Sequence, residues 1–137
     1  MNRRDLQSLA RIRAAEAGYL RAGGHYAGAY YLAGYVVECA LKACIAKTIR
    51  RHEFPDKKYI DDSYTHDLER LIRLAGLRPQ LDADMQVDPR LKSNWSVAAR
   101  WSEQSRYEER SRPEAEELLQ SILDRRYGVF QWLRRYW

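Results

Sequence analysis

The feature of this sequence that most constrains its fold is a long apolar segment, YAGAYYLAGYVVECALKACIA, which spans residues 26–46. Only two charged residues, Glu38 and Lys42, fall within it. They interrupt the segment, so no apolar run reaches the roughly 18 residues that a membrane span requires. The segment predicts one helix over about 25–51. Because a helix that is apolar on nearly all sides is enclosed by its neighbours, we expect it in the middle of a helical bundle.

The rest of the chain carries helical signals separated by polar segments. Apolar side chains recur every three or four positions from Asp5 to Arg21, which is typical of an amphipathic helix, and the pair Gly23–Gly24 ends it. The dipeptide Asp88–Pro89 marks another helix start, since Asp is a good cap and Pro is favoured at the first helical position. The predicted elements are helices over 5–21, 25–51, 65–75 (capped by Thr65 and ended by Gly76 and Pro79), 88–101, and 111 to the C-terminus (with a Ser111–Glu114 capping box), and loops over 52–64, which contains Pro55, and 102–112.

These elements predict an all-α fold. The 137 residues suit one domain over 1–137, and 7 Gly and 4 Pro are too few for the turns of a sheet-rich fold. We expect an antiparallel up-and-down helical bundle of three long helices plus one or two short ones. The first residues lack the apolar core of a secretory signal, and together with the missing membrane span this favours a cytoplasmic protein.

Arginine dominates the positive charge. The formal net charge is +5, and 19 of the 24 basic residues are Arg. Guanidinium groups pair with phosphate in a bidentate manner and stack on bases and aromatic rings. With 4 Trp, 10 Tyr and 2 Phe, this composition permits contact with nucleic acid or a nucleotide, although a solvated basic surface explains the same numbers.

Residues that commonly carry catalysis or bind metals form no motif. Cys39 and Cys44 would lie about 140° apart around one helix, so we expect two buried thiols in a reducing compartment rather than a disulfide. His25, His52 and His66 are scattered, without the spacing of a zinc site. Glycine-rich phosphate loops and serine nucleophile motifs are missing from the sequence. We therefore expect no metal and no cofactor.

The two charges of the apolar segment form the first candidate site. Glu38 precedes Lys42 by four positions, the order that favours an ion pair on one helix face. Tyr31 and Tyr35 share that face, because they precede Glu38 by seven and three positions. The pattern fits either the polar edge of a binding cleft or a semi-buried salt bridge flanked by tyrosines.

The second candidate site is a cluster that consists of Asn94, Trp95, Arg100, Trp101, Arg106 and Tyr107. An Arg–Tyr pair on a loop can bind phosphate through the guanidinium and stack a base on the phenol ring. Alternatively, Arg106 is held by an acid such as Glu38, and Tyr107 packs as a hydrophobic plug. If Glu38 and Arg106 form a buried pair, removing one partner costs about 3–5 kcal/mol.

Three segments, in this order, resemble the HEPN domain of prokaryotes. They are an Ala/Tyr-rich helix that ends in the Glu-x-x-Leu-Lys element Glu38–Lys42, a His-Asp-Leu helix start at His66–Leu68, and the pair Arg106–Tyr107 before the last helix. The similarity covers about residues 10–135. It implies a helical bundle that forms a homodimer and associates with a nucleotide or RNA, often as the toxin half of a toxin–antitoxin pair with a small nucleotidyltransferase partner.

The resemblance also implies a metal-independent ribonuclease site, in which an Arg precedes a His by five to seven positions and the His serves in acid–base chemistry. This chain departs from that pattern, because none of its three histidines follows an Arg at that spacing. Arg cannot replace the His as a base, since it stays protonated. Arg100, Arg106 and Tyr107 nevertheless keep the chemistry needed to bind phosphate or an unpaired base.

The sequence leaves three functions open. The first is a HEPN-type dimer that binds a nucleotide or RNA, has a nucleotidyltransferase partner and lacks the usual ribonuclease site. The second is a ribonuclease toxin with a divergent site, in which the fold brings His66 to Arg106. The third is a non-catalytic oligomerisation module, in which the apolar helix over 25–51 builds a homo- or hetero-oligomer. The small-residue spacing of Gly24, Gly28, Ala29 and Ala33 and the expected exposure of Trp132 and Trp137 favour it. The ligand-binding candidates are Arg100, Arg106, Tyr107, Glu38, Lys42 and His66.

Overall fold

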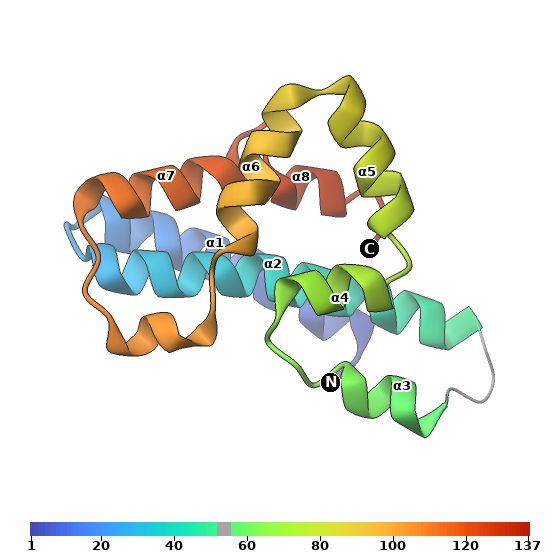
Figure 1. Cartoon of the computed structure of the whole chain (residues 1–137). Coiled ribbons are helices and arrows are strands. Elements are labelled where there is room, and N and C mark those ends of the chain that lie inside the picture. The colour runs from blue at the N-terminus through green and yellow to red at the C-terminus, as the bar shows by residue number, and fades with distance from the viewer. Residues whose placement is uncertain (52–55) are drawn as a thin grey trace.

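The computed structural model describes residues 1–51 and 56–137, and within them every regular element is helical. This confirms the predicted all-α class. No helix among these residues is both long enough and apolar enough to cross a membrane. In chain order, the elements of Figure 1 are α1 (Arg3–Ala22), α2 (Tyr26–Arg51), α3 (Lys57–Asp62), α4 (Leu68–Leu74), α5 (Arg78–Val87), α6 (Pro89–Ala99), the 3-10 helix η1 (Glu103–Tyr107), α7 (Arg112–Leu123) and α8 (Val129–Leu133).

α1 and α2 form an antiparallel hairpin (Figure 1). The side chain of Asn2 caps α1 by accepting a hydrogen bond from the Asp5 amide, and the Asn2 amide donates to the Asp5 carboxylate. The turn uses Gly24, whose φ of +80° lies in the left-handed region that favours glycine. Fully buried alanines, such as Ala17 on α1 and Ala33 on α2, leave room for close packing of the hairpin.

α2 is the central helix, as its apolar sequence predicts. It contacts α1, α4, α7, α8 and η1, and α7 lies lengthwise beside the hairpin (Figure 1). Side chains on several sides of α2, among them Val36, Val37 and Leu41, have no exposed surface. Burial of each such side chain contributes about 1.5–3 kcal/mol before the entropy of folding is subtracted, so α2 organises the core.

The third predicted long helix is divided in the structure. α7 begins at the predicted capping box of Ser111 and Glu114 but ends at Leu123. The carboxylate of Asp124 then accepts hydrogen bonds from the amides of Arg126 and Tyr127, which turns the chain before α8. Side-chain bonds of Asp to nearby amides compete with helix continuation, and the apolar periodicity of the sequence does not reveal this competition.

Short helices are more numerous between α2 and α6 than the sequence predicts. α3 lies within the predicted loop 52–64, whose residues 52–55, including His52 and Pro55, are outside the described part of the chain. Gly76, at a φ of +72°, ends α4 as predicted, and Asp67 rather than Thr65 caps that helix. Pro79 starts α5 instead of ending α4, since proline is tolerated in the first turn of a helix.

The C-terminal tryptophans are buried, which corrects the prediction that they are exposed. Trp132 is 4% exposed, and its indole N–H donates to Asp84 at 2.8 Å. Trp137 is 9% exposed and packs edge-on against Phe130. The satisfied indole of Trp132 explains how a large aromatic residue near polar neighbours joins the core. These residues therefore give no exposed surface for an oligomerisation module.

Gly34 is the point at which the loop after α6 is fixed on α2. Trp101, 3% exposed, follows α6 and lies directly on this glycine, so that a Cβ at residue 34 would be 1.9 Å from the indole ring. The rings of Tyr31 and Tyr35 flank the same indole, with centroids 6.5 and 5.1 Å away. Only glycine at residue 34 permits this contact. The contact in turn fixes Trp101, and so the position at which η1 begins.

We expect Gly34→Ala to destabilise the protein by about 1–3 kcal/mol, because the added methyl group forces the indole of Trp101 from its place. Gly18→Ala in α1 is the matched control. A Cβ there meets no atom within 4 Å, so better helix propensity stabilises this variant by up to about 1 kcal/mol. Urea unfolding of both variants measures the difference, and equal effects would contradict the assigned role of Gly34.

Candidate functional site

A buried carboxylate on α2 organises the candidate site. The side chain of Glu38 is only 5% exposed, and Lys42 Nζ donates to its Oε1 at 2.9 Å. This confirms the predicted ion pair one helical turn apart. His66, in the segment before α4, places Nδ1 2.9 Å from the same oxygen. The structure thus brings three of the predicted site residues together.

His66 links α2 to η1. Its Nδ1 faces Glu38 and its Nε2 lies 3.2 Å from Oε2 of Glu103, so one imidazole lies between two carboxylates. The contact of Nδ1 with Glu38 has hydrogen-bond geometry, and the contact of Nε2 with Glu103 is within ion-pair distance. The four residues Glu38, Lys42, His66 and Glu103 are called the Glu38 cluster below.

The Glu38 cluster is not built for maximal stability. The second oxygen of Glu38, Oε2, is buried and has no hydrogen-bond partner among the described residues, and the indole Nε1 of Trp101 is in the same condition. An unpaired buried polar group costs about 1–3 kcal/mol. Unpaired buried polar groups occur more often at functional sites than elsewhere in a protein.

Tyrosines form the aromatic side of the cluster. The Tyr31 hydroxyl donates to that of Tyr35 at 3.2 Å, and the Tyr35 ring lies edge-on to His66 with centroids 6.2 Å apart. Burial, followed by the hydrogen bond with Tyr31, raises the pKa of Tyr35 well above its ordinary value. Tyr35 therefore stays neutral at physiological pH, so its hydroxyl takes part in a hydrogen bond and does not act as a base.

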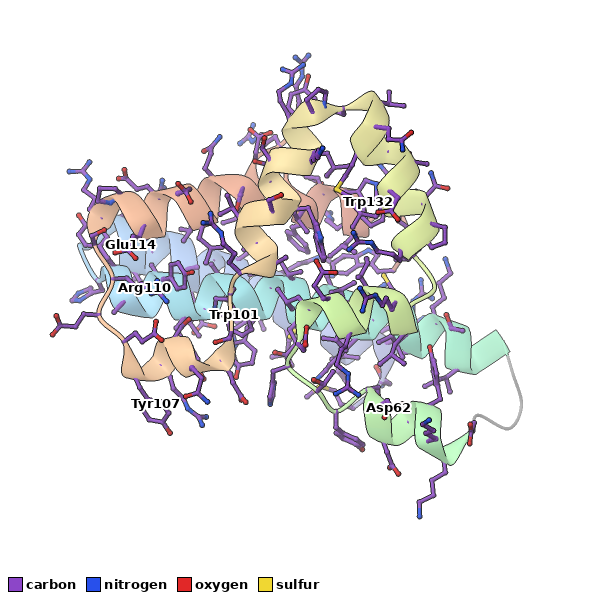
Figure 2. The ribbon with its side chains drawn as sticks, viewed as in Figure 1. Asp62, Trp101, Tyr107, Arg110, Glu114 and Trp132 are labelled. Carbon is purple, nitrogen blue, oxygen red and sulfur yellow. The ribbon has the colours of Figure 1, made fainter. Side chains whose placement is uncertain are left out.

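Arg106 and Tyr107 lie together at the end of η1 and face solvent. The guanidinium carbon of Arg106 is 4.8 Å from the centroid of the Tyr107 ring, and Tyr107 is 74% exposed. In Figure 2 the Tyr107 side chain projects away from the helices. No carboxylate lies within ion-pair distance of Arg106 in residues 1–51 and 56–137. The pair therefore presents a cation and an aromatic face to the same region of solvent.

The predicted alternative in which Glu38 holds Arg106 is wrong. Oε1 of Glu38 is already bound by Lys42 and His66, and Arg106 is exposed to solvent on η1. Glu103 is the η1 residue that reaches toward α2, and it does so through His66. Both nitrogens of His66 contact carboxylates rather than Arg106, so the arrangement expected for a divergent ribonuclease site is not observed.

Arg100 lies beside the cluster. It ends α6, pairs with Glu117 at 3.1 Å on the surface and lines a cavity of about 410 Å³. His66, Trp101 and Glu103 line the same cavity. The cavity offers hydrogen-bond donors, acceptors and one indole wall next to the exposed pair on η1.

The sequence does not predict two contacts of the site, one made by Glu103 and one by Arg110. Glu103 carries no motif, and its contact with His66 depends on how Trp101 fixes the start of η1. Arg110 lies over Tyr30 with its guanidinium carbon 4.1 Å from the ring centroid, and it pairs with Glu108 and with Glu114 at 3.1 Å. Figure 2 shows Arg110 in the segment between η1 and α7, and Glu114 in the first turn of α7. Arg110 thus fixes the far end of the η1 segment.

Neither metal chemistry nor thiol chemistry has a prepared site in the described residues. No group of three His, Cys, Asp or Glu side chains there is placed to hold a metal ion. Cys39 is half-buried and Cys44 is buried, and both are free thiols. Burial, assisted by the charge of Glu38, raises the pKa of Cys39 to about 11, and burial raises that of Cys44 to about 12.

Comparison of the chain with protein-family models, curated proteins and solved structures gave no match.

We expect Lys42→Ala to lower the free energy of unfolding by about 2 kcal/mol, because it removes the charge-assisted hydrogen bond that Lys42 donates to the buried carboxylate of Glu38. Arg112→Ala is the control. Arg112 also pairs with a glutamate at four residues' spacing and 2.9 Å, but on the exposed surface, so its loss should change stability very little. Thermal and urea unfolding compare the two, and similar losses would show that Glu38 is solvated.

Cys39 should react slowly with thiol reagents despite its partial exposure. A pKa of about 11, compared with an ordinary value of 9.0, lowers the thiolate fraction near neutral pH by about 100-fold. Iodoacetamide labelling of the Cys44→Ser variant should accelerate about tenfold per pH unit between pH 8 and 10, because the thiolate fraction rises until the pH passes the pKa. Rapid labelling at pH 7.5 would contradict the assignment of Cys39 as an inert thiol.

Proposed function

We propose that the chain binds single-stranded RNA or a nucleotide through Arg106 and Tyr107 on η1, as a HEPN-type protein without the usual ribonuclease pair. The observation that carries this proposal is the exposed Arg–Tyr pair, with the guanidinium 4.8 Å from an aromatic ring that is itself 74% exposed. Tyrosine stacks an unpaired base, with about 1–3 kcal/mol per stacked base, and the neighbouring guanidinium binds the phosphate.

The Glu38 cluster supports the proposed site by holding η1 in place. Glu103 lies three residues before Arg106 and is tied through His66 to the buried carboxylate on α2. Trp101, two residues before η1, packs on Gly34 of α2 and so fixes the chain where it enters η1. A binding pair held on a fixed segment loses less conformational entropy when a ligand arrives. His66 and Lys42 therefore act as positioning residues in this proposal, and Arg100 lines the adjoining cavity.

The homodimer, the nucleotidyltransferase partner, the role as the toxin half of a toxin–antitoxin pair and the cytoplasmic location belong to the same proposal. They rest on the resemblance carried by Glu38–Lys42, His66–Leu68 and Arg106–Tyr107. Binding without cleavage is favoured over a ribonuclease, because both nitrogens of His66 are engaged by carboxylates and neither faces Arg106. An acid–base catalyst needs a nitrogen within reach of the substrate proton.

Tyr107→Ala and Arg106→Ala are each expected to weaken binding of labelled single-stranded RNA about 10- to 100-fold, because each removes one half of the stacking and phosphate contact. Arg90→Ala is the control. Arg90 also lies over a tyrosine, 3.8 Å from the Tyr127 ring centroid, but away from η1, so its loss should leave affinity unchanged. Fluorescence anisotropy, with ATP in a parallel titration, measures binding.

The RNA recovered from each titration is then examined on a denaturing gel. Intact RNA with saturable binding is the expected result. If the wild-type protein cuts the RNA, the chain is a ribonuclease and the proposal of binding without cleavage is wrong. If neither RNA nor ATP binds saturably, the proposed site is rejected.

A further inference from the structure

The arginines of this chain divide into two groups by their partners. Among the side chains that the structure describes, in residues 1–49 and 56–137, seven arginines form ion pairs with Asp or Glu, whereas no Asp or Glu carboxylate lies within ion-pair distance of the arginines near the start of α1 or just after α8. The paired group consists of Arg13, Arg70, Arg78, Arg90, Arg100, Arg110 and Arg112. Five arginines elsewhere also form no ion pair among these side chains, namely Arg21, Arg73, Arg106, Arg125 and Arg126, whereas the other unpaired arginines lie where α1 meets the C-terminal residues.

These arginines surround one tryptophan. The guanidinium carbons of Arg11 and Arg134 are 4.8 and 5.8 Å from the ring centroid of Trp137, and Arg3 donates to the Trp137 carbonyl oxygen. Arg4 lies two turns from Arg11, so both occupy one face of α1. Cation–π contact restrains the guanidinium groups and leaves their N–H edges available for an anion. We call Arg3, Arg4, Arg11, Arg134 and Trp137 the Trp137 surface.

A cavity adjoins the Trp137 surface. It has a volume of about 520 Å³ and is lined by Met1, Asn2, Arg3 and Arg4 at the start of the chain and by Ala46 and Ile49 on α2. One side of it thus carries two guanidinium groups beside Met1 and Asn2, and the other side is apolar. A guanidinium rim beside an apolar floor suits a ligand that carries both negative charge and apolar groups, as a nucleic-acid strand does with its phosphates and bases.

We infer that the Trp137 surface is a second contact for single-stranded RNA, which binds several phosphates of the strand whose bases engage Arg106 and Tyr107. Arg3 and Arg11 lie eight residues apart on α1, or about 12 Å along the helix axis. That span exceeds one phosphate group, so the surface fits a polymer rather than a mononucleotide. The inference rests on the proposed function. It identifies the ligand as an RNA strand that is too long to be bound by Arg106 and Tyr107 alone.

The test compares two triple variants with the same change in net charge. Arg4→Gln/Arg11→Gln/Arg134→Gln removes exposed arginines of the Trp137 surface and keeps Arg3, which contacts the chain end. Arg70→Gln/Arg90→Gln/Arg112→Gln removes exposed arginines that are already ion-paired. Circular dichroism melts confirm that both variants are folded. Binding of ATP and of an oligouridylate of about 20 nucleotides, longer than the 4–16 of a single site, is measured across salt concentrations.

We expect the first variant to reduce the slope of log Kobs against log salt by about 2, since each lost phosphate contact on a single strand contributes about 0.7. Its ATP affinity should equal that of wild type, and the second variant should keep the wild-type slope. Equal effects of both variants would reduce the inference to net charge and overturn it. An unchanged slope in the first variant would also overturn it.

Two further outcomes separate this inference from its alternatives. If Arg106→Ala abolishes RNA binding while the first triple variant changes nothing, the proposed function stands and the Trp137 surface is not part of it. If the surface arginines are needed for cosedimentation with phosphatidylserine vesicles but not for RNA binding, the surface belongs to an anionic membrane and the inference fails.

Discussion

Enclosure of α2 is the constraint on which the rest of the structure depends. A helix that is apolar on most of its circumference needs neighbours on most sides, and α1, α4, α7, α8 and η1 supply them. The closest approach is that of Trp101 to Gly34, where the absence of a side chain on α2 admits an indole ring. The one carboxylate on this helix, Glu38, is buried with it, so it also needs partners, and these come from its own helix and from the segment before α4.

These requirements explain why the proposed binding pair lies on η1. The segment between α6 and α7 has little core of its own, since most of its side chains face solvent. It is fixed at three places instead: by Trp101 on Gly34, by Glu103 on His66, and by Arg110 over Tyr30. Between these fixed points, Arg106 and Tyr107 are left free to meet a ligand. A rigid scaffold that presents exposed polar and aromatic residues on a loop is a common arrangement for binding.

Features that depend on neighbours in sequence were predictable, and features that depend on distant contacts were not. The all-α class, the bounds of α1 and α2, the Ser111 capping box and the Glu38–Lys42 pair all follow from periodicity or spacing within one helix. The break after Leu123 was missed because Asp124 bonds to amides of the following turn, and α5 was missed because Pro79 was read as a stop. The partners of Glu38 beyond its own helix, and the burial of Trp132 by Asp84, arise only in three dimensions.

The central claim is that Tyr107 stacks on a base of bound RNA, and photo-crosslinking tests it most directly. A single-stranded RNA with photoreactive uridines is irradiated with the protein, and the attached peptides are identified by mass spectrometry. Tyr19 and Tyr64 are internal references, since they are 80% and 74% exposed but lie on α1 and before α4. We predict that Tyr107 carries the dominant crosslink. Crosslinks spread equally over the three exposed tyrosines, or found only at Tyr19 and Tyr64, would contradict the account.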